Sequence, residues 1–368
     1  MDVLSLLIKS ASSSCNLNCR YCFYQDVSAH RKWKNRGIMK AEVVTQLIQN
    51  AFQSAKKAVI FSFQGGEPLL AGLPFYEAFV EKVALLNHNN CRIVYSIQTN
   101  GVLIDENWAG FFKKNNFLVG VSLDGPEFVH NQNRITNKKE GSFDEVMKGI
   151  AHLKKADVNF NILSVLTSTS IVHSKEILSF FKKEAFSYLQ FIPYVPNLDL
   201  QENDPYIVTP RQYEEFLNIA LDWWEQELNE NHLVGIRYFD NIISLILGFQ
   251  PQSCDLSGHC SNNLVIEADG SVYPCDFYVL DEWKMGSVVD NTFEEIVAHP
   301  KSKKFVEDSL QVPTSCLNCS FYQLCKGGCK RYKEMTNTHN PYYCEAYLAF
   351  FQKNILRLEK LAERIYYV

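Results

Sequence analysis

The segment that decides the fold spans residues 15–22, Cys-Asn-Leu-Asn-Cys-Arg-Tyr-Cys. Its cysteines, Cys15, Cys19 and Cys22, have the spacing CxxxCxxC. Three thiolates can bind three irons of a four-iron cluster and leave the fourth iron without a protein ligand, whereas clusters that only carry electrons normally have four cysteine ligands. Structural zinc sites favour CxxC pairs accompanied by a second pair or by histidines, and no second pair lies nearby. The segment therefore predicts an iron–sulfur cluster with one open coordination site.

Length and composition limit the class of protein. The chain has 368 residues, of which 46% are hydrophobic, and a formal net charge of −5. This length suits two domains or one large barrel with an extension, and the absence of a basic surplus argues against a nucleic-acid platform. The N-terminal residues lack the basic region of a signal peptide, and no apolar stretch has the roughly 20 residues of a membrane span. We expect a cytoplasmic protein without membrane partners, whose 12 cysteines are kept reduced for metal binding.

The N-terminal half alternates between strand-like and helix-like segments. Short strands rich in β-branched or aromatic residues are predicted at Leu4–Lys9, Val59–Gln64, Arg92–Gln98, Leu118–Leu123, Asn159–Leu166 and Tyr188–Tyr194. Amphipathic helices are predicted at Lys40–Ala55, Phe75–Leu86, Ser142–Lys155 and Ser174–Lys183. This alternation indicates right-handed βαβ units and a parallel sheet. Six strands predict an α/β fold with a partial (β/α)6 barrel of the TIM type, whose functional residues follow the carboxyl ends of the strands.

A second region of different character follows. After a polar linker at residues 196–208, Thr209 and Pro210 are the predicted cap and first residue of a helix to Asn229. Residues 263–276 predict a β-hairpin with a tight turn at Asp269-Gly270, and residues 341–368 predict a C-terminal helix. We therefore expect two domains, 1–235 and 236–368, with eight of the cysteines in the second.

The cysteine triad, with the aromatic Tyr21 before its third member, resembles the radical S-adenosylmethionine (SAM) superfamily. The run Gly65-Gly66-Glu67-Pro68 resembles the second motif of that superfamily, in which glycine backbone and a carboxylate approach the amino group of SAM. The resemblance implies that Ser122 and Arg134 contact the ribose and the methionyl carboxylate, and that Val195 packs on the adenine. By spacing alone, Arg134 could equally be a solvated residue of the loop 131–137.

The other cysteines match the SPASM extension of radical SAM enzymes. They are Cys254, Cys260, Cys275, Cys316, Cys319, Cys325, Cys329 and Cys344. Eight ligands suffice for two fully ligated four-iron clusters, and the competing interpretation is two structural zinc sites. The resemblance implies an interleaved assignment, in which Cys254, Cys260, Cys275 and Cys329 hold the first auxiliary cluster and Cys316, Cys319, Cys325 and Cys344 hold the second. Cys91 is not assigned to any cluster and is interpreted as a buried hydrophobic residue.

Motifs along nearly the whole chain resemble the anaerobic sulfatase-maturating enzymes. Among them are Phe63–Pro68, Gln98–Gly101 and Asp269–Tyr278. The resemblance implies that SAM and three [4Fe–4S] clusters oxidise a cysteine or serine of a sulfatase polypeptide to Cα-formylglycine, through a 5′-deoxyadenosyl radical that abstracts hydrogen from Cβ. It also implies an electron donor such as flavodoxin or ferredoxin.

Asp276 directly follows an auxiliary-cluster cysteine and is the candidate base, because a carboxylate beside a dry cavity can have a raised pKa. A turn or cap carboxylate is the alternative. The candidate substrate-binding residues are Tyr24, Gln64, Gln98 and Arg237, the last by resemblance alone, and each could instead only support its neighbours.

Two other functions fit parts of the pattern. One is a different SPASM peptide maturase, which would form thioether or carbon–carbon crosslinks in a ribosomal peptide. The other is a non-catalytic, zinc-binding interaction protein, which would be colourless and would not cleave SAM.

Overall fold

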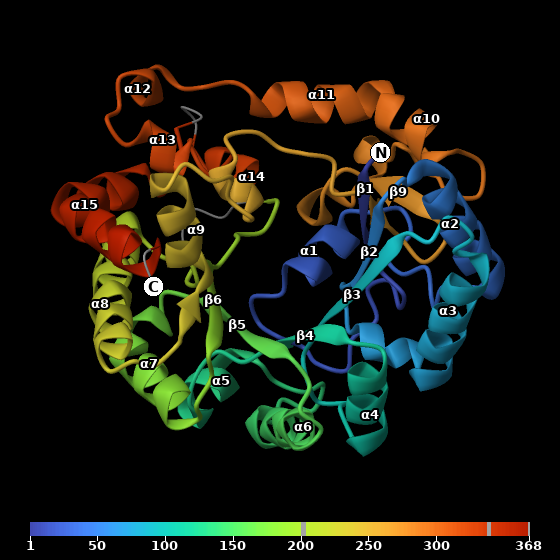
Figure 1. Ribbon diagram of the computed structural model, residues 1–368, viewed down its shortest axis with the longest axis horizontal. Coiled ribbons are helices and arrows are strands. Elements are labelled where there is room, and N and C mark those ends of the chain that lie inside the picture. The colour runs from blue at the N-terminus through green and yellow to red at the C-terminus, as the bar shows by residue number, and fades with distance from the viewer. Residues whose placement is uncertain (200–203, 337–339, 367–368) are drawn as a thin grey trace. The chain divides into compact units, whose positions relative to one another are not determined.

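The computed structural model describes residues 1–199, 204–336 and 340–366. These residues form two compact units (Figure 1). The first comprises Met1–Leu123, His130–Asn161 and Asn262–Phe305, and the second comprises Asp124–Val129, Ile162–Ser261 and Val306–Val368. The predicted domain boundary between residues 235 and 236 stays a prediction.

The first unit is built on a mostly parallel sheet with the strand order β10–β9–β8–β1–β2–β3–β4. Its strands are β1 (Val3–Ile8), β2 (Ala58–Phe63), β3 (Arg92–Thr99), β4 (Phe117–Ser122), β8 (Val265–Ile266), β9 (Ser271–Tyr273) and β10 (Gly286–Ser287). Strands β1 to β4 are parallel to one another, so their carboxyl ends lie at one edge of the sheet. The short strand β8 continues the sheet by pairing in parallel with β1.

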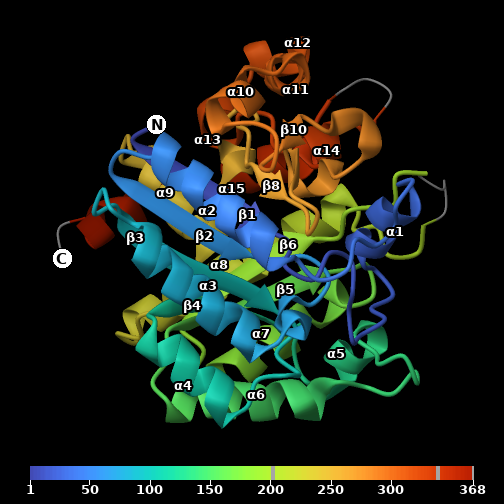
Figure 2. The ribbon, with the colours of Figure 1, turned by 90° about the vertical axis from the view of Figure 1, so that its right-hand side faces the viewer.

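Helices cover one face of this sheet and form the core with it. They include α2 (Ala41–Ser54), α3 (Leu73–Leu86) and α4 (Glu106–Lys114). The unit also contains α1 (Phe23–Ala29), η1 (Pro68–Ala71), α6 (Phe143–Lys155), η4 (Asp276–Tyr278), η5 (Asp281–Trp283) and α10 (Phe293–Ala298). Figure 2 shows α2 and α3 running along β1, β2 and β3. The rings of Phe61 and Phe79 meet edge-on with centroids 5.2 Å apart, and Phe63 meets Tyr76 at 5.0 Å. Burial of each such side chain contributes about 1.5–3 kcal/mol to folding.

Because side chains alternate along a strand, the residues between these buried aromatics face the other side of the sheet. Toward the carboxyl ends of the strands that side is polar: Ser96 Oγ donates a hydrogen bond to Ser62 Oγ at 2.8 Å, and these residues are partners in the register of β2 and β3. Because Gln64 and Gln98 each lie two residues after these serines, they are on the same polar face, at the carboxyl ends of their strands.

The second unit combines parallel strands with helices. Its elements are η2 (Ile171–His173), α7 (Ser174–Lys183), β6 (Tyr188–Pro193), α8 (Pro210–Asn229), β7 (Gly235–Ile236), α9 (Arg237–Ile246), η3 (Cys254–Leu256), α12 (Thr314–Leu317), α13 (Tyr322–Cys325), α14 (Lys330–Lys333) and α15 (Cys344–Tyr366). Strand β6 pairs with β7 and with β5 (Phe160–Leu166), and α8 lies beside α15 (Figure 1). Three elements, β5, α5 (Glu127–Asn133) and α11 (Pro300–Ser309), contain residues of both units.

The predicted strands and helices are confirmed, with shifts of one or two residues at their ends. Thr209 caps α8 through a capping box with Gln212, as its position before Pro210 predicted. The hairpin at residues 263–276 is confirmed with shorter strands. The C-terminal helix begins at Cys344 rather than at Pro341, and residues 367–368 of that prediction lie outside the described residues, as do residues 200–203 of the linker. Across the described residues, none of the helices has both the length and the apolar character that crossing a membrane requires.

Candidate active site

A largely buried carboxylate, with a side chain 13% exposed, lies at the carboxyl edge of the first unit's sheet. Asp276 opens η4 directly after Cys275, and its Oδ2 accepts hydrogen bonds from the Tyr24 hydroxyl at 2.5 Å and from Gln64 Nε2 at 3.3 Å. Gln64 Nε2 also donates to the Tyr24 hydroxyl oxygen at 2.8 Å. The ammonium of Lys9 lies 3.7 Å from Asp276 Oδ1 and 4.2 Å from the centre of the Tyr24 ring. Three side chains from three parts of the sequence therefore converge on one carboxylate.

Opposing effects set the protonation of this carboxylate. Burial raises the pKa of Asp276 above its ordinary value, whereas the positive charge of Lys9 and the hydrogen bond from Tyr24 lower it. Burial and the adjacent negative charge also raise the pKa of Tyr24 well above its ordinary value, so this hydroxyl stays protonated and acts as a donor. A carboxylate held in this way can accept a proton from a group placed against it.

A second buried carboxylate, Glu67, follows β2 in the run Gly65-Gly66-Glu67-Pro68. Its Oε1 accepts hydrogen bonds from the Thr99 hydroxyl at 2.8 Å and the Leu69 amide at 3.0 Å, and its Oε2 accepts one from the Asn100 amide at 2.7 Å. Burial raises the pKa of Glu67 to about 7. The double glycine is required here: Gly66 has a φ of +54°, and a Cβ on it would stand 2.2 Å from the Ser14 carbonyl oxygen.

The loop of the N-terminal cysteines lies beside this turn. Cys15 Sγ accepts a hydrogen bond from the Leu17 amide at 3.4 Å and one from Asn100 Nδ2 at 3.8 Å. Burial raises the pKa of Cys15 to about 11 and also raises that of Cys22, while Arg134 and Lys9 lower the pKa of Cys22. The guanidinium of Arg134 lies 5.4 Å from the centre of the Tyr21 ring, and Arg134 is buried, so it is not the solvated loop residue of the alternative interpretation.

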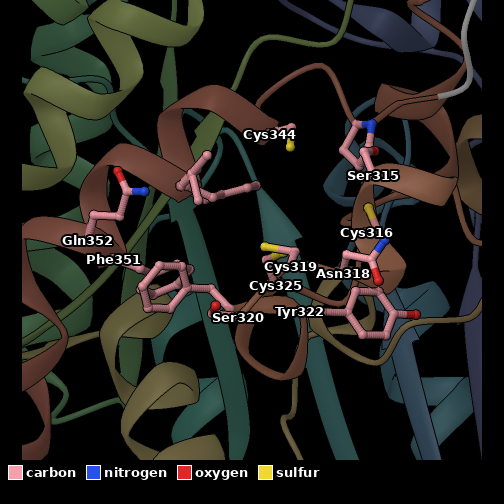
Figure 3. Close-up of a pocket in the computed structure, with 14 residues that line it drawn as sticks. Ser315, Cys316, Asn318, Cys319, Ser320, Tyr322, Cys325, Cys344, Phe351 and Gln352 are labelled. Atoms are coloured by element: carbon pink, nitrogen blue, oxygen red, sulfur yellow. The ribbon is translucent and has the colours of Figure 1, made fainter.

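Four cysteines of the second unit surround one cavity. Cys316, Cys319, Cys325 and Cys344 line a cavity of about 330 Å³. Figure 3 shows them around the same space; they come from α12, the connection between α12 and α13, α13 and the start of α15. Desolvation and, to a smaller extent, the charges of the other three cysteines raise the pKa of Cys325 to about 11. This is the set that the resemblance assigned to the second auxiliary cluster.

The other set is divided between the units. Cys254, Cys260 and Cys329 influence one another electrostatically, and burial raises the pKa of Cys329 to about 12. Cys275, the fourth member, belongs to the first unit. Arg237 belongs to the second unit, at the start of α9, where its charge lowers the pKa of Cys254.

These observations fit iron–sulfur clusters. All twelve cysteines are free thiols, and burial raises the pKa of most of the proposed ligands, so a metal is needed to hold them as thiolates. Cys316, Cys319, Cys325 and Cys344 share one cavity, and Cys254, Cys260 and Cys329 interact with one another. Cys91, by contrast, is buried and its thiol donates to the Ala55 carbonyl at 3.7 Å.

The remaining predicted residues take less central positions. Gln98 Nε2 donates to Ser122 Oγ at 3.1 Å, at the ends of β3 and β4, and Val195 is buried in the second unit. Sequence reasoning missed Lys9 and Asn100 as site residues. Both had a signal, because Lys9 follows the first strand and Asn100 follows the third, as Gln64 follows the second.

Comparisons with known proteins identify the class of protein to which the chain is similar. A profile of the radical SAM superfamily matches residues 10–180, and one of the SPASM iron–sulfur cluster-binding domain matches residues 254–320. The cysteine-type anaerobic sulfatase-maturating enzyme of Clostridium novyi is 45% identical over 100% of this chain and 99% of its own length. The serine-type enzyme of Bacteroides thetaiotaomicron is 31% identical over 95% of this chain and 89% of its own length. A solved structure described as native anSMEcpe with bound AdoMet and Cp18Cys peptide has a TM-score of 0.94 at 41% identity, covering 99% of both chains.

The fold and the site thus define a radical SAM enzyme with a SPASM domain, and the predicted partial barrel is confirmed as its fold class. The same two domains confirm SAM and [4Fe–4S] clusters as the predicted cofactors. Within this class, the chain belongs to the family of anaerobic sulfatase-maturating enzymes.

Proposed function

We propose that this enzyme oxidises a cysteine side chain of an extended sulfatase segment to Cα-formylglycine. The observation that carries the proposal is Asp276, a buried carboxylate held by Tyr24, Gln64 and Lys9 next to an auxiliary-cluster cysteine. A cysteine target is favoured over serine because the cysteine-type relative is 45% identical and the serine-type relative 31%. Neither a crosslinking maturase nor a zinc-binding interaction protein is favoured by the relatives.

The proposed cofactor sites follow the assignment of the cysteines. Cys15, Cys19 and Cys22 would hold the SAM-binding cluster, and the two sets of four, all within residues 236–368, would hold the auxiliary clusters. Glu67 would accept the amino group of SAM, with Tyr21, Gly65, Gly66, Ser122, Arg134 and Val195 as its other contacts. When bound, SAM and its cluster supply a carbon-centred radical that removes one hydrogen atom from the target Cβ, and the auxiliary clusters supply an acceptor for one further electron.

The chain itself supplies the proton acceptor and the substrate's position. Oxidation of the cysteine side chain to a thioaldehyde also releases one proton, which Asp276 accepts. The Tyr24 hydroxyl and Gln64 fix the carboxylate by donating to Oδ2, so Oδ1 faces the proton, while Lys9 offsets the negative charge before transfer. Gln98 and Arg237 are proposed to bind the backbone of the segment. Water then converts the thioaldehyde to the aldehyde.

An anaerobic assay tests the proposal. Protein with reconstituted clusters is incubated with SAM, dithionite and a sulfatase-derived peptide that contains either cysteine or serine at the target position. We expect mass spectrometry to show replacement of sulfur by oxygen with loss of two hydrogens in the cysteine peptide, together with 5′-deoxyadenosine. A cyclic product that has lost two hydrogens and kept its sulfur would indicate a crosslinking maturase instead.

A further inference from the structure

An exposed basic segment, residues 30–37, is attached to the residues that precede Cys15. Three hydrogen bonds anchor it: Ser13 Oγ to the Lys34 carbonyl at 2.7 Å, Asn35 Nδ2 to Ser14 Oγ at 2.8 Å, and the Arg36 amide to Ser12 Oγ at 3.0 Å. Within the segment Arg31 is buried and its Nη1 pairs with Glu267 Oε1 at 2.5 Å. The anchors leave Lys32 and Lys34 exposed, and Trp33 is 62% exposed between them.

A second basic segment, residues 134–141, is attached to the cluster loop from another direction. Leu17 forms a bridge with Thr136, and the Asn18 amide donates to the Ile135 carbonyl at 2.7 Å. Ile135 also bridges Gly141, so residues 136–140 form the tip of a small hairpin. Lys138 and Lys139 are exposed at this tip.

Both segments are attached to residues 12–18, so their exposed cations flank the loop of the N-terminal cysteines. We define the basic rim as Arg20, Lys32, Lys34, Lys138 and Lys139, the exposed cations of residues 12–22, 30–37 and 134–141. The exposed carboxylate of the same residues is Glu140, so cations outnumber it five to one in a chain of net charge −5. Two other carboxylates lie close to residues 30–37. Asp269 pairs with Arg36, which is not part of the rim, and Asp281 accepts a hydrogen bond from the Lys32 amide at 2.7 Å and lies 3.9 Å from the Arg36 guanidinium.

The rim is suited to a protein that approaches the cluster closely. The three cysteines are only partly buried, and Arg20 lies in the loop between two of them. A partner held by the rim would therefore contact the protein directly over the cysteine loop. Exposed lysines steer a negatively charged partner and raise its association rate, and a large exposed aromatic ring such as Trp33 is a common anchor of an interface.

We propose that the basic rim is the docking surface for an acidic one-electron carrier protein, which reduces the N-terminal cluster. One electron passes from the reduced carrier to the cluster, the carrier is oxidised, and no bond or proton is exchanged. This inference rests on the proposed function, because it requires that the three cysteines hold the SAM-binding cluster. A nucleic acid is less favoured, since the rest of the chain is acidic.

The test compares two reductants of the same cluster. The variant Lys32→Glu/Lys34→Glu/Lys138→Glu/Lys139→Glu reverses four charges of the rim and leaves Arg20 intact within the cluster loop. With a reduced acidic bacterial ferredoxin as the probe, we expect the variant to form 5′-deoxyadenosine about tenfold or more slowly than the unaltered enzyme at low salt. With dithionite, which needs no docking, the rate should equal that of the unaltered enzyme. The ferredoxin-driven rate of the unaltered enzyme should also fall as salt is added.

A matched control reverses four exposed lysines elsewhere, Lys114→Glu/Lys148→Glu/Lys303→Glu/Lys353→Glu. It changes the net charge equally and should keep the ferredoxin-driven rate within about twofold, since distant charges are screened. Equal losses in the two variants, or no loss in the rim variant, would overturn the proposal. A nucleic-acid result would also overturn it: the unaltered enzyme and the control bind a double-stranded oligonucleotide, the rim variant does not, and the rim variant keeps its ferredoxin-driven rate.

Folding of the rim variant is controlled independently. If the four glutamates prevent folding, the corresponding four glutamine substitutions replace them, and calorimetric titration with oxidised ferredoxin measures docking directly. Undiminished ferredoxin affinity in that variant would overturn the docking surface while leaving the proposed function intact. Unaltered enzyme that fails to cleave SAM even with dithionite would contradict the proposed function and the docking surface with it.

Discussion

Among single residues, Asp276 has the most specific chemical assignment. The substitution Asp276→Asn keeps a side chain of the same shape but removes the proton acceptor. We expect 5′-deoxyadenosine formation to continue, because the SAM-binding residues are unchanged, and formylglycine to fall by about a hundredfold or more. Both products are measured in the same anaerobic reaction. Asp290→Asn, at an exposed position, is the control, and undiminished formylglycine from Asp276→Asn would remove this residue from the base role.

Glu67 makes the stability of the cofactor-free protein depend on pH. Its folded-state pKa of about 7 lies above the ordinary 4.5, so the folded protein binds this proton more tightly than the unfolded chain. The contribution of Glu67 to the free energy of unfolding is therefore complete below pH 4.5 and is lost as pH rises through about 7. Between those limits it amounts to about 3 kcal/mol. We expect the free energy of unfolding, measured with urea, to fall more steeply from pH 5 to pH 8 in the unaltered protein than in Glu67→Gln. Equal slopes would contradict the assignment.

The site residues that sequence reasoning placed correctly are those with a local signal. Gln64 follows a strand of alternating buried residues, so its position at the carboxyl edge follows from the strand pattern. Its contact with Asp276 does not, because that contact joins residues far apart in the chain. Lys9 has the same local signal as Gln64. Its role, however, depends on its contact with Asp276, which follows the hairpin and is far from Lys9 in the sequence.

At the scale of elements, the pairing of strands β3 and β4 requires a residue without a side chain in β4. Gly120 is the register partner of Gln98, and a Cβ on it would stand 2.0 Å from Gln98 Oε1. Gly120→Ala must therefore displace the amide that donates to Ser122. We expect a loss of about 1–3 kcal/mol in the free energy of unfolding and weaker SAM binding, measured by denaturation and by equilibrium titration.

The control for that substitution is Gly110→Ala on helix α4, where an added Cβ would meet nothing within 4 Å. An alanine in a helix should stabilise the protein by about 0.4–1 kcal/mol and leave SAM affinity unchanged. If Gly120→Ala behaves like Gly110→Ala, the close approach to Gln98 has no energetic consequence.

The same scale explains which elements could be predicted. Helices and six strands were predictable because their apolar periodicity is local, and the hairpin because Asp269-Gly270 forms its turn. The parallel pairing of β8 with β1 was not predictable. It involves a strand of two residues, and the turn that forms the hairpin carries no information about which distant strand the hairpin will extend.

Across the whole molecule, the cysteines show what the number and order of ligands in a sequence can predict about metal sites. The number of ligands and their order came from the sequence, but their grouping depends on the fold. Cys316 and Cys319 lie close in sequence, whereas Cys344 reaches their cavity because α15 begins there. Cys329, four residues after Cys325, belongs electrostatically with Cys254 and Cys260 instead. Neighbouring cysteines can thus serve different sites, and the sites should fail separately.

Two substitutions test this independence. Cys15→Ala should remove the SAM-binding cluster and with it about a third of the iron, if three four-iron clusters are present. SAM cleavage should be lost, while the paramagnetic signals of the reduced auxiliary clusters remain. Cys344→Ala should remove the second auxiliary cluster and lower formylglycine, yet leave SAM cleavage near its original rate, because the residues around Glu67 are untouched. Iron and sulfide analysis, electron paramagnetic resonance and 5′-deoxyadenosine measurement separate the two cases. Full 5′-deoxyadenosine formation by Cys15→Ala would show that the open coordination site lies elsewhere, and loss of all clusters in either variant would show that the three sites form one cooperative unit.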